Sequence, residues 1–405
     1  MHWMTRWAGG FPVFADHAEG AFLTDVDGHR YLDLCLGDTG AMAGHAPPAT
    51  VAAVETQARR GLTFMLPTED SLWVGEELAR RFGLPVWQFA LTATDANGFA
   101  IRLARHITGR RFVLVFNWCY HGTVDESFAT LRDGRTVART GNVGPPVDPA
   151  VTTKVVEFND PAALETALAP GDVACVLAEP AMTNVGIVLP DPGFHQALRG
   201  LTQRTGTLLV IDETHTISAG PGGYTGAYGL EPDMLTVGKA VAGGVPGAAY
   251  GFTASVAERI ASATEADCID TGGIGGTLAA NALAAAAMRA TLQSVLTEES
   301  FRRTIPLAER FTAGVAGAIA EHGLPWTVQR LGCRAEYWFR PVPPRNGAAA
   351  AMSTDAELER YMHLAALNRG ILLTPFHNMA LIAPTVTESD VDRHTEVFRE
   401  SVAAL

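Results

Sequence analysis

The chain has 405 residues, of which 47% are hydrophobic and 18% are charged, and its formal net charge is −13. A chain this long and this apolar buries a large core, which excludes global disorder, and its acidic balance argues against nucleic acid or an anionic membrane as the main partner. Five scattered cysteines without a CxxC pair, and a start that lacks a signal-peptide layout, predict reduced thiols, no metal site and a cytoplasmic location.

The predicted elements begin with a β-hairpin over residues 20–36, where two strand-like segments flank a turn-rich centre. Helical spacing follows at 49–60 and 71–82. From about 87 to 255, apolar runs (87–91, 112–116, 173–178, 207–211, 234–237 and 248–252) alternate with helical segments, which include 97–106 and 194–204. This alternation predicts an α/β fold with a mainly parallel sheet covered on both faces, and ligand sites of such sheets lie beyond the carboxyl ends of the strands.

The regular alternation of apolar runs and helical segments ends before about residue 295. The expected elements are a helix, a strand, a loop and two further helices, at 298–322, 335–339, 341–353, 355–369 and 388–403; the tract 346–351 is expected to be a surface loop. We predict an N-terminal segment and hairpin (1–48) that contributes to a small domain, a large domain (49–296) and a smaller C-terminal α+β domain (297–405).

Two of the apolar runs end in residues able to carry chemistry. The run 207–211 leads into Asp212, and the run 234–237 leads into Lys239, which precedes a glycine-rich stretch. The chain holds only one other lysine, Lys154, and we predict a structural role for it. Lysine is the side chain that forms a Schiff base, and it loses its proton when desolvated, so Lys239 is predicted to be reactive. A helix cap or a solvated strand end is the alternative for Asp212.

The surrounding motifs resemble the signature of class III aminotransferases, pyridoxal-phosphate enzymes of fold type I. The matching segments are Ile211-Asp212-Glu213-Thr214-His215-Thr216, Gly220-Pro221-Gly222-Gly223-Tyr224, Gly238-Lys239 and Gly243-Gly244. The resemblance covers nearly the whole chain and is greatest to the glutamate-1-semialdehyde aminomutase-like branch. It implies pyridoxal 5'-phosphate as the cofactor and a homodimer with shared active sites.

The resemblance also implies roles around the cofactor ring. Lys239 would hold the cofactor as a Schiff base and move the substrate proton, and Asp212 would pair with the pyridine nitrogen. Thr214 would press against one ring face and Tyr120 would stack on the other, with core packing as the alternative for Tyr120. His121, which follows in the same motif, is included among the cofactor-binding residues, and a purely structural role is its alternative.

Three further motifs complete the cofactor site that the resemblance implies. Thr94 and the amides of Ala93 and Asp95 would bind the phosphate at a helix start, although Ala93 stands where the family usually has glycine. Glu179 would lie near the phenolic oxygen of the cofactor. Thr277 would bind the phosphate of the partner's cofactor, which makes dimerisation a catalytic requirement.

Substrate selection leaves several possibilities open. Arg334 is a candidate for binding a substrate carboxylate, with a surface ion pair as the alternative, and Trp118 is a candidate for the pocket wall, with core packing as the alternative. The leading hypothesis is a transaminase that moves an amino group from an amine or amino acid, including β- and ω-amino acids, to a keto acid, ketone or aldehyde in two half-reactions. The alternative is an aminomutase of the glutamate-1-semialdehyde type. No G-x-S-x-G elbow of an α/β-hydrolase is present, and Gly220-Pro221-Gly222 is a poor dinucleotide fingerprint.

Overall fold

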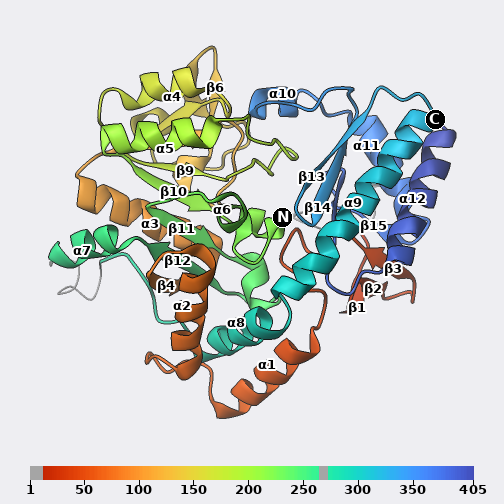
Figure 1. The fold of residues 1–405 in the computed structure, drawn as a ribbon, viewed down its shortest axis with the longest axis horizontal. Coiled ribbons are helices and arrows are strands. Elements are labelled where there is room, and N and C mark those ends of the chain that lie inside the picture. The colour runs from red at the N-terminus through yellow and green to blue at the C-terminus, as the bar shows by residue number, and fades with distance from the viewer. Residues whose placement is uncertain (1–11, 264–271) are drawn as a thin grey trace.

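The computed structural model describes residues 12–263 and 272–405. A seven-stranded sheet with the order β4-β12-β11-β10-β9-β5-β8 lies at the centre of the part of the chain that precedes residue 263 (Figure 1). Its strands are β4 (Val86–Ala90), β5 (Phe112–Phe116), β8 (Thr153–Val156), β9 (Val173–Ala178), β10 (Leu208–Asp212), β11 (Met234–Val237) and β12 (Ala248–Phe252). Only β12 runs antiparallel to its neighbours in this sheet, so the predicted mainly parallel sheet is confirmed.

Helices cover both faces of this sheet because its strands are apolar on both faces. Along β5, Val113 and Val115 pack with helix α3, whereas Leu114 and Phe116 pack with helices α4 and α5, as the alternation of side chains in a strand requires. The helices of this region are α1 (Pro48–Arg60), α2 (Glu69–Phe82), α3 (Ala93–Thr108), α4 (Pro161–Leu168), α5 (Phe194–Thr205), α6 (Gly223–Tyr228), α7 (Ala254–Ser262) and α8 (Ala282–Ser294). A separate hairpin, β6 (Ala129–Arg132) and β7 (Arg135–Ala138), was not expected from the sequence.

The C-terminal region forms a smaller α+β unit on the side of the molecule opposite α4 and α5 (Figure 1). It contains α9 (Glu298–Glu321), α11 (Ala356–Leu367) and α12 (Glu388–Ala403), and a three-stranded sheet of β13 (Thr327–Leu331), β14 (Arg334–Trp338) and β16 (Met379–Leu381). The expectation of a surface loop over 346–351 is wrong. Asn346 caps a short helix, α10 (Gly347–Ala351), and Ala350 is buried against the core, because an alanine run after an asparagine cap favours a helical turn.

The N-terminal hairpin joins this C-terminal region. It consists of β1 (Ala15–Glu19), β2 (Phe22–Asp25) and β3 (Arg30–Asp33), and β3 pairs in parallel with β15 (Ile371–Leu372). The pairing is consistent with the prediction that residues 1–48 contribute to the small domain, whose boundaries remain a prediction.

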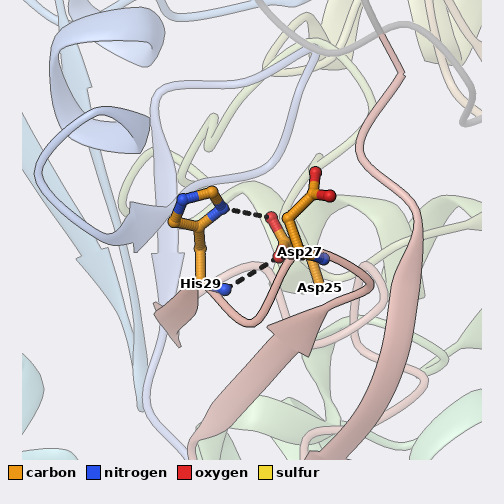
Figure 2. A group of neighbouring side chains, drawn as sticks. All are labelled: Asp25, Asp27 and His29. Carbon is orange, nitrogen blue, oxygen red and sulfur yellow. Dashed lines mark hydrogen bonds and ion pairs between the residues drawn. The ribbon is translucent and has the colours of Figure 1, made fainter.

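The turn of this hairpin is organised by one carboxylate (Figure 2). Asp25 Oδ1 accepts hydrogen bonds from the amides of Asp27 (3.0 Å) and His29 (2.8 Å), and its Oδ2 accepts one from the Tyr31 hydroxyl (2.8 Å). The His29 ring lies 3.2 Å from the same oxygen. The acidic and histidine side chains here are explained by the turn itself, since Asp side chains commonly bond to amides two residues on.

Lys154 and the cysteines were also singled out in the sequence. Lys154 Nζ donates to Asp172 Oδ1 (2.6 Å) and to a carbonyl oxygen of α4, which is a structural role. Four cysteines, Cys35, Cys119, Cys175 and Cys333, are buried free thiols, and Cys268 lies outside the described residues. No helix in the described parts of the chain has the length and apolar character that a membrane span needs.

Candidate functional site

A cavity of about 640 Å³ lies at the carboxyl ends of the central strands. Asp212 is the last residue of β10, and Lys239 follows β11 after a single glycine. The structure brings most of the residues singled out in the sequence onto this one wall: Ala93, Thr94, Tyr120, His121, Asp212, Thr214 and Lys239. Segments far apart in sequence meet here because parallel strands end at one edge of a sheet.

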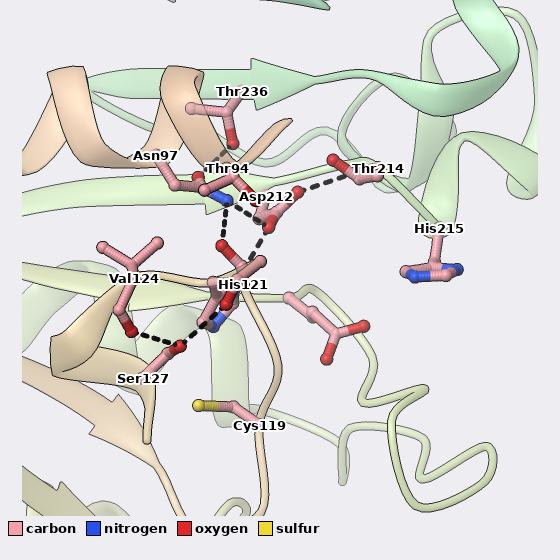
Figure 3. Close-up of polar contacts among 12 residues, drawn as sticks. Thr94, Asn97, Cys119, His121, Val124, Ser127, Asp212, Thr214, His215 and Thr236 are labelled. Carbon is pink, nitrogen blue, oxygen red and sulfur yellow. Dashed lines mark hydrogen bonds and ion pairs between the residues drawn. The ribbon is translucent and has the colours of Figure 1, made fainter. Parts of the chain in front are cut away.

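Asp212 is held by a buried hydrogen-bond network (Figure 3). Its Oδ2 accepts from Asn97 Nδ2 (2.8 Å) and lies 2.9 Å from His121 Nδ1, and its Oδ1 accepts from the Thr214 amide (3.0 Å). Burial alone would raise the pKa of the Asp212 carboxyl, but the bond and charge of His121 lower that pKa below its usual value. Burial likewise opposes a charged His121, yet the adjacent Cys119 and Asp212 raise the His121 pKa. Asp212 is therefore an ionised carboxylate whose position is fixed.

Asn97 is a positioning residue that the sequence reasoning missed. Its amide also donates to the His121 carbonyl oxygen (3.1 Å), and its Oδ1 accepts from the Thr236 hydroxyl (2.7 Å). The available signal was a polar residue on the inner face of α3, one turn after the strand–helix junction.

Replacing Asn97 with alanine is expected to lower the free energy of unfolding by about 2–3 kcal/mol, because buried bonds to a charged group are lost and Asp212 is left partly unsatisfied. The same variant should bind cofactor less tightly. Urea denaturation measures the first effect. His106→Ala, an exposed change on the same helix, should stay within about 0.5 kcal/mol of the wild type. Equal losses in the two variants would contradict the role given to Asn97.

The N-terminus of α3 lies on the cavity wall, where its first amides could hold an anion. Thr92 caps the helix and accepts from the Asp95 amide (3.2 Å), whereas Ala93 and Thr94 occupy the first turn, where amides have no intrahelical partner. Ala93 packs against Gly238, where an added Cβ would come within 3.1 Å of the Ala93 Cβ. Because Gly238 has no side chain, it leaves room for the alanine at position 93, where the family usually has glycine.

Gly122 lets the segment that holds Tyr120 and His121 pack closely against the start of this helix. It has a φ of 80°, and a Cβ added there would lie 2.1 Å from Thr94 Oγ1 and 2.8 Å from Thr94 Cα. Only glycine allows both the positive φ and the close approach. The ring of Tyr120, two residues before Gly122, is half-buried and lines the cavity. It packs edge-on against Phe128, with 6.1 Å between the ring centroids.

Gly122→Ala is expected to weaken binding of a phosphate-bearing cofactor by at least about tenfold, because the added methyl group pushes Thr94 away from the anion site. Cofactor titration followed by absorbance measures the change. Gly134→Ala is the matched control, since Gly134 has a φ of 72° and nothing within 4 Å of an added Cβ. Its cost should be confined to backbone strain of about 1 kcal/mol, with cofactor affinity unchanged.

Lys239 lies among polar partners on the cavity wall. Its Nζ is 2.6 Å from His215 Nε2 and 3.3 Å from Asp38 Oδ2, and its backbone has a φ of 50°, a strained value of the kind found at functional sites. Burial and the charge of Lys239 hold the pKa of His215 well below its usual range. A neutral imidazole carries one proton. With Nε2 accepting from Lys239, that proton sits on Nδ1 and is donated to Thr39 Oγ1 at 2.9 Å.

Five predicted residues lie off the described cavity wall. Arg334 is only 1% exposed and donates to Thr39 and to Met379 Sδ, so it is not a surface ion pair, and the fully buried guanidinium has no opening to the cavity. Glu179 is buried, is bonded by Thr183, and burial raises its pKa to about 7. The amide of Asp95 donates to the Thr92 side chain that caps α3. Trp118 packs with the apolar cluster around α4 and α5, and Thr277 is exposed.

The residues present fit pyridoxal phosphate. Thr214 Oγ1, His121 Nε2 and Glu179 Oε1 are buried without a hydrogen-bond partner, and all three belong to the segments that the resemblance assigns to the cofactor. Together with the free amides of α3 they supply polar groups for a phosphate and a heteroaromatic ring. The amine of Lys239 and the carboxylate of Asp212 line the same cavity.

Comparisons with known proteins agree with this geometry. The profile of the family Aminotransferase class-III matches residues 3–402. The glutamate-1-semialdehyde 2,1-aminomutase of Neisseria gonorrhoeae (strain ATCC 700825 / FA 1090) is 36% identical over 98% of this chain and 93% of its own length. A glutamate-1-semialdehyde-aminomutase from Pseudomonas aeruginosa PAO1, whose lysine-to-alanine variant was solved in complex with PMP, is 53% identical with a TM-score of 0.97, covering 100% of this chain and 90% of that one. An omega-transaminase from Sphaerobacter thermophilus is 28% identical with a TM-score of 0.89, covering 98% and 92%.

Proposed function

Because the chain belongs to the class III aminotransferases, pyridoxal-phosphate enzymes of fold type I, we propose that it is an aminomutase that moves an amino group between neighbouring carbons of one small aminoaldehyde of the glutamate-1-semialdehyde type. The observation that carries this proposal is the similarity, along almost the whole chain, to proteins of that activity. An aminotransferase in the strict sense, which the family resemblance first suggested, is the second candidate.

Pyridoxal phosphate, when bound, supplies an aldehyde that condenses with amines and a protonated ring that accepts electrons from the substrate carbon. In our proposal the amides at the start of α3 and the Thr94 hydroxyl hold its phosphate. Asp212 keeps the ring nitrogen protonated, since an ionised carboxylate beside a basic nitrogen favours the charged form. Tyr120 and Thr214 confine the ring from its two sides.

Lys239 is the residue we assign to proton movement at the substrate carbon. Its Nζ lies 2.6 Å from His215 Nε2, which accepts a hydrogen bond from the amine and so orients it. The Thr39 hydroxyl holds the ring of His215 in the required tautomer from behind. Glu179, whose raised pKa leaves it partly protonated near neutral pH, is assigned to the phenolic oxygen of the cofactor.

The proposal includes a homodimer in which each copy completes the other's site. Thr277 is exposed and does not line its own chain's cavity, as expected for a residue that serves the partner. The neighbouring Gly272 and Ile274 help to line a second hollow, of about 910 Å³, together with α3, next to the anion site. Sedimentation equilibrium tests the dimer, and mixing Thr277→Ala with Lys239→Ala chains tests the sharing, because hybrid dimers contain one unmodified site.

The test of the main proposal is turnover of glutamate 1-semialdehyde without any second substrate. An aminomutase converts it to its isomer with no 2-oxoacid present, whereas an aminotransferase needs both an amino donor and a carbonyl acceptor. The similarity to an omega-transaminase supports the second candidate. Turnover that stops after one equivalent and resumes on adding pyruvate or 2-oxoglutarate would favour that candidate.

A further inference from the structure

A strained turn forms part of the cavity wall next to Lys239. The backbone φ values of Leu36, Asp38 and Thr39 are 48°, 50° and 81°, and Gly37 between them is also positive. Consecutive left-handed residues that are not glycine each cost about 1–2 kcal/mol, so the surrounding structure must hold them. Strain of this kind collects at functional sites.

The turn points a carboxylate at the reactive amine. Asp38 Oδ2 lies 3.3 Å from Lys239 Nζ, and the Asp38 side chain lines the cavity with 19% of its surface exposed. No arginine lines the described part of this cavity. Arg334 lies nearby, but it is 1% exposed and its guanidinium contacts Thr39 and His215, so the cavity wall presents the Asp38 carboxylate and not Arg334.

The basic groups that face Asp38 come from four different segments: Lys239, His215, Arg334 and, from the loop before β16, His377. Although burial opposes ionisation, the positive charges around the carboxylate, those of Lys239 and Arg334 among them, hold the pKa of Asp38 well below its usual range. Its contact with Lys239 therefore favours the charged carboxylate.

We propose, on the basis of the function proposed above, that Asp38 determines substrate class by selecting amines whose amine-bearing carbon carries no carboxylate. An amine that reacts here brings its nitrogen next to Lys239 Nζ, so the substituents of the neighbouring carbon come close to Asp38. An α-carboxylate would place two like charges together in a partly buried site, whereas a neutral substituent or a second ammonium group is accepted.

This selectivity agrees with the proposed substrate. In glutamate 1-semialdehyde the amine-bearing carbon carries an aldehyde, and the carboxylate stands at the far end of the molecule. The same rule admits simple amines and ω-amino acids and rejects ordinary α-amino acids.

The test compares two donors that differ only by the α-carboxylate, glutamate and 4-aminobutyrate. In the wild-type holoenzyme, 4-aminobutyrate should bleach the visible band of the bound coenzyme faster in single-turnover measurements. In Asp38→Asn the ratio of the glutamate rate constant to the 4-aminobutyrate rate constant should rise about tenfold or more. Asp38→Gly should give the same shift, and both replacements tolerate the left-handed backbone.

Two controls separate charge from folding. Asp27→Asn removes one charge from the exposed hairpin turn (Figure 2) and should leave the ratio unchanged, and Asp38→Glu keeps the charge and should keep the discrimination. An unchanged ratio in both Asp38→Asn and Asp38→Gly overturns the proposal, as does an equal loss with the two donors, which would mark Asp38 as a positioning residue.

A spectroscopic titration tests the same charge without any turnover. With a carboxylate beside Lys239 Nζ, removal of that carboxylate should shift the pH midpoint of the coenzyme's visible band down by about one unit, a tenfold change. An unmoved midpoint overturns the inference even if neither donor reacts. A wild-type protein that shows no visible band when loaded with pyridoxal phosphate would contradict the proposed function instead, so the two failures are distinguishable.

Discussion

Lys239→Ala should lower turnover by about 10⁴-fold or more, because the variant loses both the amine that binds the cofactor covalently and the base that moves the substrate proton. The purified variant should also lack the yellow colour of a coenzyme joined to a lysine. Steady-state rates and the visible spectrum measure the two effects.

The chain offers a matched control for this change, since it has only one other lysine. Lys154 lies on β8, the edge strand at the other end of the sheet from β4, and it pairs with Asp172 outside the cavity. Lys154→Ala should keep the colour and nearly all of the activity. Normal turnover by Lys239→Ala, or equal losses in the two variants, would remove Lys239 from the mechanism.

Asp212→Asn should retain the fold and bind cofactor, yet turn over about 10²–10³-fold more slowly, a loss typical of removing one preorganised electrostatic partner of the developing charge. Asparagine has the shape of aspartate and its single oxygen can still accept from the Thr214 amide, but it carries no charge to keep the ring nitrogen protonated. Single-turnover rates with a bound donor measure this step directly.

Asp172→Asn serves as the comparison for Asp212→Asn, because Asp172 is partly exposed and bonds Lys154. Its activity should stay close to that of the wild type. If both variants turned over at the wild-type rate, the Asp212 carboxylate would have no part in the chemistry.

The large sheet and the family could be read from the sequence because both depend on local patterns. Buried parallel strands are continuous apolar runs, so β9 and β10 stand out, and the residue after each such strand falls at the sheet edge where ligands bind. Lys239 and Asp212 could be found in this way, and the family profile and the relatives confirm the membership that their motif suggested.

The residues that hold and surround these two could not be found in the same way. Asn97 reaches Asp212, Gly122 fits against Thr94, and Asp38 contacts Lys239 only because distant segments meet in space. No periodicity records such contacts. Short strands such as β15 were missed for a similar reason, since their partners, and not their own composition, make them strands.

The pairing of β3 with β15 joins the turn that carries Asp38 to a segment near the end of the chain. Leu34, just before the left-handed turn, donates its amide to Leu372 and accepts from the amide of Leu381, both close to the carboxyl terminus. A chain that ends before residue 371 lacks both of these partners, so in such a chain the turn that carries Asp38 should lose its anchor.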